Sequence, residues 1–339
     1  MVDINWKELT FGYTKTDYNV RSYYKDGKWS PLEKSDSQMV SMHIAATCLH
    51  YGQESFEGLK AFRGKDGKVR VFRWQDNCTR LQHSAEAICM AVVPEDLFKE
   101  AVFEVVRLNE EYIPPYGTGG SLYLRPLLIG TGARVGVKPA DEYLFLIFAT
   151  PVGPYFKEGF NPVRMQIVHD FDRAAPKGTG HVKVGGNYAA SLKAGERAHH
   201  EGYAASVFLD SKTHTKIDEA GPANFFAIKN GTYITPKSHS ILPSITNMSL
   251  RTLANDLGLK VEERSIPLEE LDTFEEAGAC GTAAVISPIS EIQDRETGKI
   301  YKFPSGDKAG KWCTQLYQQL QGIQYGELED KFGWCEIVL

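Results

Sequence analysis

A lysine in an unusual local setting is the first residue whose type and position could do chemistry. Lys183 lies between Val182 and Val184, and the run GGNY at 185–188 follows it directly. Apolar neighbours disfavour the charged form of an amine and lower its pKa, and glycines let a bound ring approach the backbone closely. This setting suits a lysine that acts as a nucleophile. An exposed lysine before a Gly-Gly turn is the alternative that composition alone leaves open.

A second segment could bind an anion. Ser244 can cap a helix over residues 245–257, of which Ile245 and Thr246 form the start. The unpaired N–H groups and the positive dipole end of such a helix attract a phosphate. Two glycine-rich segments do not match nucleotide motifs: 178–186 lacks the Gly-Lys-Ser/Thr ending of a P-loop, and 130–136 misses the dinucleotide spacing by one residue.

Thiol and imidazole groups show no ligand spacing. The six cysteines, at 48, 78, 89, 280, 313 and 335, form no Cys-x-x-Cys pair, and the sequence contains no His-Glu-x-x-His run. We therefore expect reduced thiols, with neither a metal site nor a disulfide framework.

The elements that position these residues fall into two parts. In the first half, strands are predicted at 68–72, 121–130 and 142–151, and helices at 76–90 and 94–112. The segment after the third strand is rich in proline and glycine and lacks periodicity, which is typical of a linker. We expect a small α+β domain at 1–152, a linker at 153–162 and a larger α+β domain at 163–339.

In the second half, strands are predicted at 163–171 and 205–210 and helices at 187–202, 245–257 and 308–323. The Asn230-Gly231 pair, followed by the strand-like TYIT, indicates a hairpin. Antiparallel pairing is therefore expected more than repeated βαβ units, which argues against a doubly wound sheet.

Composition excludes several classes of partner. The 339 residues are 42% hydrophobic and carry a net charge of −5 with a pI near 6.0, so a nucleic acid or an anionic membrane is not expected to bind. The longest uncharged runs, 143–156 and 277–290, have 14 residues, where a membrane span needs about 20. The start of the chain carries Asp3, Lys7 and Glu8 where a secretory signal would be apolar. A cytoplasmic protein that acts on small molecules is predicted.

Seven segments, taken together, resemble one enzyme family. VKVGGNY at 182–188, DEAGPANFF at 218–226, ILPSITNMSLR at 241–251 and CGTAAVISP at 280–288 are similar to the large branched-chain amino-acid aminotransferases. YGQESFEGLKAFRG at 51–64, VRVFRWQDNCTRL at 69–81 and SLYLRPLLIG at 121–130 resemble the small domain of the same family.

The resemblance implies a two-domain α+β fold of type IV, like that of D-amino-acid aminotransferase. It also implies pyridoxal 5'-phosphate (PLP) at the domain interface and a homodimer. The implied reaction is ping-pong transamination between branched-chain L-amino acids (Leu, Ile, Val) and 2-oxoglutarate, which gives branched-chain 2-oxo acids and L-glutamate.

The resemblance also assigns cofactor residues. Lys183 matches the lysine that binds PLP covalently and then, once freed, moves a proton as general acid and base. Glu219 matches the carboxylate that keeps the pyridine nitrogen protonated, and Tyr188 matches the phenol that bonds the 3-oxygen. Outside this context, Glu219 would be read as an exposed turn acid. The remaining matches are to phosphate-binding and nearby cofactor residues: Arg80, Thr282, Ile245, Thr246 and, near the cofactor, Arg173.

For the substrate, Tyr51, Phe56 and Tyr123 match aromatic walls of the side-chain pocket, and the backbone around Thr282 and Ala283 matches the site of the α-carboxylate. Glutamate must fit the same pocket, and Arg125 with Tyr123 could contact its side-chain carboxylate. A structural ion pair is the other role open to Arg125, and the aromatic residues could equally be core.

Two departures from the family pattern stand out. Ala284 and Ser287 occupy the places of a Cys-x-x-Cys redox pair found in animal members, so that thiol switch is not expected here. Pro222 stands where a small hydroxyl residue is frequent. The rival enzymes are a D-amino-acid transaminase and an aminodeoxychorismate lyase, which share the fold and the lysine but usually lack the segments at 51–62 and 122–126. A non-catalytic binding protein on the same fold is the rival outside enzymes.

Overall fold

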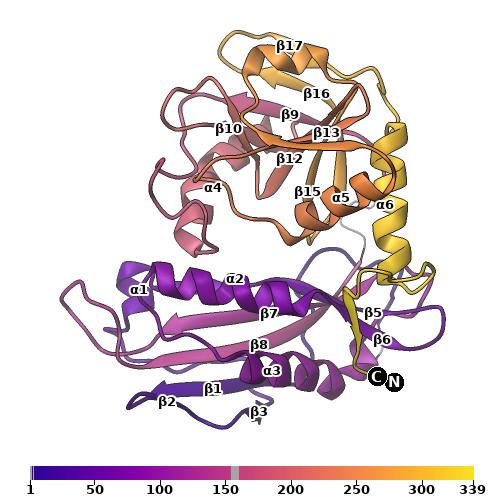
Figure 1. The fold of residues 1–339 in the computed structure, drawn as a ribbon. Coiled ribbons are helices and arrows are strands. Elements are labelled where there is room, and N and C mark those ends of the chain that lie inside the picture. Colours follow the sequence, from indigo (N-terminus) through magenta and orange to yellow (C-terminus); the bar gives the residue numbers. More distant parts are fainter. Residues whose placement is uncertain (1, 3, 154–159) are drawn as a thin grey trace. The chain divides into compact units, whose positions relative to one another are not determined.

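The computed structural model describes all residues except 1, 3 and 154–159. The chain forms two compact units (Figure 1). The first takes its residues from Met1–Tyr155, Val182–Gly185 and Gly322–Leu339, and the second from Phe156–His181 and Gly186–Gln321. Most of the linker expected at 153–162 lies outside the described residues.

The first unit is built on one antiparallel sheet. Its strand order is β18-β6-β5-β7-β8-β1-β2, with β3 paired to β1 and β4 paired to β7. The strands are β1 (Asn19–Lys25), β2 (Lys28–Trp29), β3 (Glu33–Ser35), β4 (Glu54–Phe56), β5 (Leu59–Arg63), β6 (Val69–Phe72), β7 (Ser121–Gly130), β8 (Tyr143–Val152) and β18 (Cys335–Ile337). The helices are α1 (Thr47–Tyr51), α2 (Trp74–Ala87), α3 (Glu95–Leu108) and the short 3-10 helix Glu110–Tyr112.

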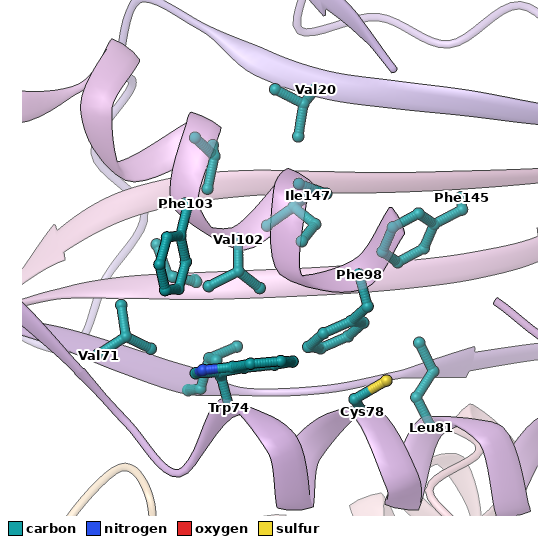
Figure 2. Packing of buried hydrophobic residues seen from close by; sticks show 14 of the residues in the cluster. Val20, Val71, Trp74, Cys78, Leu81, Phe98, Val102, Phe103, Phe145 and Ile147 are labelled. Carbon is teal, nitrogen blue, oxygen red and sulfur yellow. The ribbon is translucent and has the colours of Figure 1, made fainter. Parts of the chain in front are cut away.

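Alternation along β7 gives this sheet two different faces. Leu122, Leu124 and Leu128 are buried in a core that includes residues of α2 and α3, among them Trp74 and Phe98 (Figure 2). Successive side chains of a strand point to opposite faces, so the odd-numbered residues of β7 lie on the other face. That second face carries the side chains that could do chemistry.

The second unit closes part of its sheet into a ring. Its order is β11-β10-β9-β16-β15-β12-β13-β14, and β11 also pairs with β12. Its strands are β9 (Val163–Val168), β10 (Ala205–Leu209), β11 (Ile217–Ala220), β12 (Ala223–Lys229), β13 (Thr232–Pro236), β14 (Lys260–Arg264), β15 (Glu276–Gly281), β16 (Val285–Asp294) and β17 (Ile300–Lys302). The helices are α4 (Gly185–His200), α5 (Ile245–Asp256), the 3-10 helix Leu268–Thr273 and α6 (Lys311–Gln324), within which the chain returns to the first unit.

Strand direction in the second sheet follows the sequence prediction. Within the described residues, only β9–β10, β9–β16 and β13–β14 run parallel. The predicted hairpin at Asn230-Gly231 joins β12 to β13, and both residues have positive φ, 49° and 68°. Two consecutive positive φ values are what a type I′ turn requires. The mainly antiparallel α+β prediction is therefore confirmed. In the part of the chain that the structure describes, no helix is long and apolar enough to cross a membrane.

Candidate active site

Lys183 belongs to the first unit, where its backbone is fixed on both sides. Its N–H donates to Ser84 Oγ at 3.0 Å, and its carbonyl accepts from Ser55 Oγ at 3.0 Å and from the N–H of Phe56 at 3.2 Å. The neighbouring valines are buried and Lys183 itself is half-buried. Its Nζ lies 4.7 Å from the centre of the Phe56 ring. The amine is thus held at a defined position over an aromatic face.

Phe56, Arg125 and Tyr123 form a contiguous cluster on the second face of the sheet. The Arg125 guanidinium lies 4.8 Å from the centre of the Phe56 ring, and its Nη2 donates to Tyr123 Oη at 3.1 Å. Arg125 makes no ion pair with any described residue, and its Nε is buried without a hydrogen-bond partner there. The N–H at Nε of such an arginine can therefore donate a hydrogen bond to a bound carboxylate.

Two members of this cluster were missed by the sequence analysis. The Phe11 ring packs edge-on against Tyr123, with centroids 5.2 Å apart, and Lys60 Nζ lies 5.9 Å from the centre of the Phe11 ring. Lys60 is only 8% exposed, and burial lowers its pKa to about 7. The apolar residues on either side, Leu59 and Ala61, were a usable signal for Lys60, because alternation sends the residue between them to the opposite face. Phe11 had no such signal.

Tyr51 contacts a different part of the first unit. It ends α1, is 40% exposed, and donates its hydroxyl to the carbonyl of Val135. Its ring lies near that of His50. The described contacts of Tyr51 are therefore with the 131–142 loop and with His50.

Arg80 is paired with a buried acid. Its Nε and Nη2 bond both oxygens of Glu57 at 2.7 and 2.8 Å, and Glu57 is fully buried. Asn77 and the N–H of Gly58 also donate to this carboxylate. A bidentate pair of this kind fixes the orientation of the guanidinium on α2. Glu57 is a further residue that the sequence analysis did not single out.

In the second unit, Glu219 and Arg173 form a buried ion pair. Glu219 Oε2 lies 3.5 Å from Arg173 Nε, and Glu219 Oε1 accepts the N–H of Leu242 at 2.8 Å. Arg173 also donates to the carbonyls of Gly180, at 3.1 Å, and Ser240. An N–H donor and a guanidinium both favour the ionised form of a carboxylate. Glu219 lies on β11 and is 3% exposed, so it is a buried anion and not an exposed turn acid.

The start of α5 is built as the sequence predicted. Ser244 caps the helix by accepting the N–H of Asn247 at 3.2 Å, and Ile245 and Thr246 are buried in its first turn. Asn247 in turn bonds Asn224 and Thr235. The first N–H groups of a helix have no acceptor within it, so this end is suited to an anion. Tyr188, in the first turn of α4, is half-buried.

Thr282 and Ala283 lie in the three-residue turn between β15 and β16, where Gly281 pairs with Val285. Both turn residues are half-buried. Val285 has φ of 64°, which is strained for a β-branched residue and costs about 1–3 kcal/mol. The pairing of the two strands therefore holds this turn in a conformation that the local sequence does not favour.

The candidate residues of the first unit and of the second unit, together with this fold, define the protein as a fold type IV aminotransferase. The chain belongs to the amino-transferase class IV family, whose model matches residues 54–292. Within the described residues, no group of three or more His, Cys, Asp or Glu side chains is placed to hold a metal ion.

Among its relatives is the branched-chain-amino-acid aminotransferase of Haemophilus influenzae, 49% identical over 98% of each chain. The Helicobacter pylori enzyme of the same name is 50% identical over 98% of this chain and 97% of its own. Among solved structures, the Escherichia coli branched-chain amino acid aminotransferase matches 96% of this chain and 100% of its own, with a TM-score of 0.81 and 30% identity.

Class IV aminotransferases depend on PLP, and the residues present here fit that group. The half-buried amine of Lys183 suits covalent attachment to an aldehyde, and the ionised, buried Glu219 suits a protonated ring nitrogen. The start of α5 offers backbone donors for a phosphate. Each requirement is met by the chemistry of a described side chain or helix end.

Proposed function

We propose that this chain transfers the amino group of branched-chain L-amino acids (Leu, Ile and Val) to 2-oxoglutarate, with PLP as cofactor and by a ping-pong mechanism. The observation that carries the proposal is the cluster around Lys183, which joins an apolar surface, Phe56, to a cation, Arg125. The two bacterial relatives, which share about half of their residues with this chain along almost the full length, support the choice of substrate.

We assign eight residues to the cofactor. Lys183 would bind it covalently, Glu219 would serve its ring nitrogen and Tyr188 its 3-oxygen; Ile245, Thr246, Thr282 and Arg80 would hold the phosphate, and Arg173 would act beside Glu219. When bound, PLP accepts the electrons left on the substrate's Cα after a proton is removed. Arg80 enters this role already paired with Glu57, so we expect it to orient a phosphate oxygen more than to add net charge.

Lys183 Nζ is the group that moves the proton. Once the amino group of the substrate has displaced Lys183 from the cofactor, the freed amine would take the proton from the substrate's Cα and return it as an acid. Its backbone bonds to Ser84, Ser55 and Phe56 hold the start of the side chain in place, so a transfer needs motion only along the flexible stem. Glu219, which accepts the N–H of Leu242 and pairs with Arg173, would keep the ring nitrogen of PLP protonated.

The substrate side chain is assigned to Phe56, Tyr123 and Arg125, and its α-carboxylate to the backbone at Thr282 and Ala283. Leu, Ile and Val need apolar contact, which the ring of Phe56 supplies. The side-chain carboxylate of glutamate needs donors, and Arg125 has one buried N–H that no described residue uses. Tyr51 stays a prediction as a pocket wall.

We further propose a homodimer. Ile44, Leu49, Val135 and Val137 are apolar side chains with large exposed fractions, on two segments joined by the hydrogen bond from Arg134 N–H to the carbonyl of Ala45. Several exposed apolar side chains on neighbouring segments are typical of an interface. Sedimentation should give twice the chain mass, and Val135→Asp should shift the protein toward monomer. The cytoplasmic location stays a prediction.

The decisive experiment is half-reaction spectroscopy on protein supplied with PLP. Mixing with L-leucine, L-isoleucine or L-valine alone should remove the visible band of the lysine-bound cofactor, and 2-oxoglutarate should restore it. D-Alanine is the matched control and should leave the band in place. Loss of the band with D-alanine but not with the branched-chain amino acids would favour the D-amino-acid rival and overturn the proposal.

A further inference from the structure

Glu54 is a half-buried acid beside the candidate lysine, and it has no part in the proposed mechanism. It lies on β4, where it is opposite Ile129 of β7. Its Oε1 accepts the N–H of Gly185, two residues after Lys183. Burial raises the pKa of Glu54, whereas the Gly185 N–H and the Arg125 guanidinium lower it. Partial removal of a carboxylate from water costs free energy, so its place next to the lysine segment calls for a functional explanation.

Three consecutive residues of β4 bond the chain around the lysine. Phe56 donates its N–H and Ser55 its hydroxyl to the carbonyl of Lys183, and Glu54 accepts the N–H of Gly185. β4 is itself paired with β7, the strand that carries the arginine and the tyrosine assigned to the substrate. All of these residues belong to the first unit. β4 therefore sets where the lysine backbone lies relative to the residues assigned to the substrate side chain.

The bond to Glu54 acts where the chain is intrinsically flexible. Val184 separates the lysine from two consecutive glycines, Gly185 and Gly186. Glycine has no side chain to pack and loses more conformational freedom on folding than any other residue. A Cβ at residue 185 would overlap the Glu54 carboxylate, so the acid occupies the space that a side chain would take. Glu54 thus supplies from outside the anchor that a glycine side chain cannot provide.

We propose that Glu54 is a positioning residue for Lys183, and that it keeps the lysine backbone in place by holding the N–H of Gly185 while the lysine side chain moves a proton. This inference deepens the proposed function and rests on it. A hydrogen bond to a carboxylate is roughly twice as strong as one between neutral groups, which suits an anchor on a flexible segment. Because Glu54 acts through the backbone, its loss should slow proton transfer more than it weakens substrate binding.

The test follows the half-reaction of the PLP-loaded enzyme with L-leucine in single turnover, which separates the rate constant at saturation from the dissociation constant. Glu54→Leu keeps the approximate size of the side chain but removes the acceptor. Its rate constant should fall about tenfold or more, the effect of losing one charged hydrogen bond, while the dissociation constant stays within about threefold of the wild type. Hydrogen exchange of the Gly185 amide is the second measurement and should become faster in this variant.

Two further variants make the result specific. Glu54→Gln keeps an oxygen that can accept the same N–H, so it should restore part of the rate and slow the exchange again. Glu275→Leu is the matched control, because Glu275 accepts the N–H of Asn230 at 2.9 Å at the β12–β13 hairpin. The control should change neither kinetic constant nor the exchange of Gly185. Thermal melting shows whether each variant is folded.

A Glu54→Leu rate constant within about threefold of the wild type, or a loss confined to the dissociation constant, would overturn the inference. Unchanged exchange of the Gly185 amide in Glu54→Leu would overturn it too, as would the absence of any recovery in Glu54→Gln. The proposed function is read separately, from the wild type. A wild type that loses its visible band with L-leucine, while Glu54→Leu reacts equally fast, overturns only the role of Glu54. A wild type whose band persists with every branched-chain amino acid overturns the proposed function itself.

Discussion

The two units hold their candidate residues by different means. In the first unit, the side chains of Phe56 and Arg125, both assigned to the substrate, pack on one another across a sheet face. In the second, Glu219 is held by a backbone N–H, and Thr282 and Thr246 lie at a strand turn and a helix start. Side-chain packing depends on the size of each neighbour, whereas backbone geometry does not. The first arrangement suits selection of the substrate side chain, and the second suits groups that do not vary, namely the cofactor and the α-carboxylate that every substrate carries.

The strongest test of this division is Lys183→Ala, which should abolish turnover because no other amine takes its position. Binding of PLP through Arg80 and the residues of the second unit should persist at reduced affinity. Borohydride reduction of the wild type should fix the cofactor to the peptide that contains residue 183. Lys193→Ala, which removes an exposed lysine of α4, is the control; label on Lys193 in the wild type would refute the assignment.

Glu219→Gln should lower the rate of the half-reaction on the order of 10²-fold or more. Each tenfold loss of rate corresponds to about 1.36 kcal/mol of activation free energy. The substitution removes the charge that keeps the ring nitrogen protonated but leaves the shape of the side chain. Asp218→Asn is a matched control, because Asp218 is the adjacent buried acid and bonds Ser240 instead. A Glu219→Gln rate within about threefold of the wild type would place Glu219 outside the site.

Gly58→Ala should have a smaller effect, confined to the substrate. A Cβ at residue 58 would overlap the hydroxyl and ring of Tyr123, so Tyr123 must move away from Arg125. We expect the KM for 2-oxoglutarate to rise about tenfold, the cost of one charged hydrogen bond, with PLP affinity unchanged. Gly195→Ala on α4 meets no atom within 4 Å and should change neither quantity. A loss of PLP affinity in Gly58→Ala would break the division between the units.

The smallest expected effect is that of oxidation. Burial raises the pKa of Cys280 to about 12 and that of Cys313 well above its usual value, so both thiols stay protonated and unreactive. Mild peroxide should therefore leave activity largely unchanged, since Ala284 and Ser287 supply no thiol near the turn. Rapid inactivation that dithiothreitol reverses, with a mapped Cys280–Cys313 disulfide, would contradict this prediction.

Local patterns predicted the elements better than the partners of individual side chains. The strand over 121–130 and the helix start at 245 match the structure, because an apolar run and a capping serine act within a few residues. Strand β1 was missed, since NVRSYYK alternates poorly and is stabilised by pairing with β8.

The partners of the site residues could not be predicted from the sequence, because they lie in distant segments of the chain. Lys183 was found from its immediate neighbours, but the residues that hold it, Ser55 and Ser84, lie about a hundred residues away in the chain. Sequence separation also hid the pairing of Arg80 with Glu57, which are 23 residues apart, and the packing of Phe11 on the distant Tyr123. A motif indicates which residue reacts, whereas the residue's environment depends on the complete fold.

The return of the chain to the first unit at Gly322 has a consequence for synthesis on the ribosome. Strand β18 pairs with β6 at one end of the first sheet, yet it is synthesised about 260 residues after β6. At about 5–20 residues per second, β6 waits on the order of ten seconds or more for its partner. During that interval β6 is an open strand edge that could pair with another chain. Nascent chains that stall before residue 335 are therefore expected to bind chaperones or aggregate through this edge.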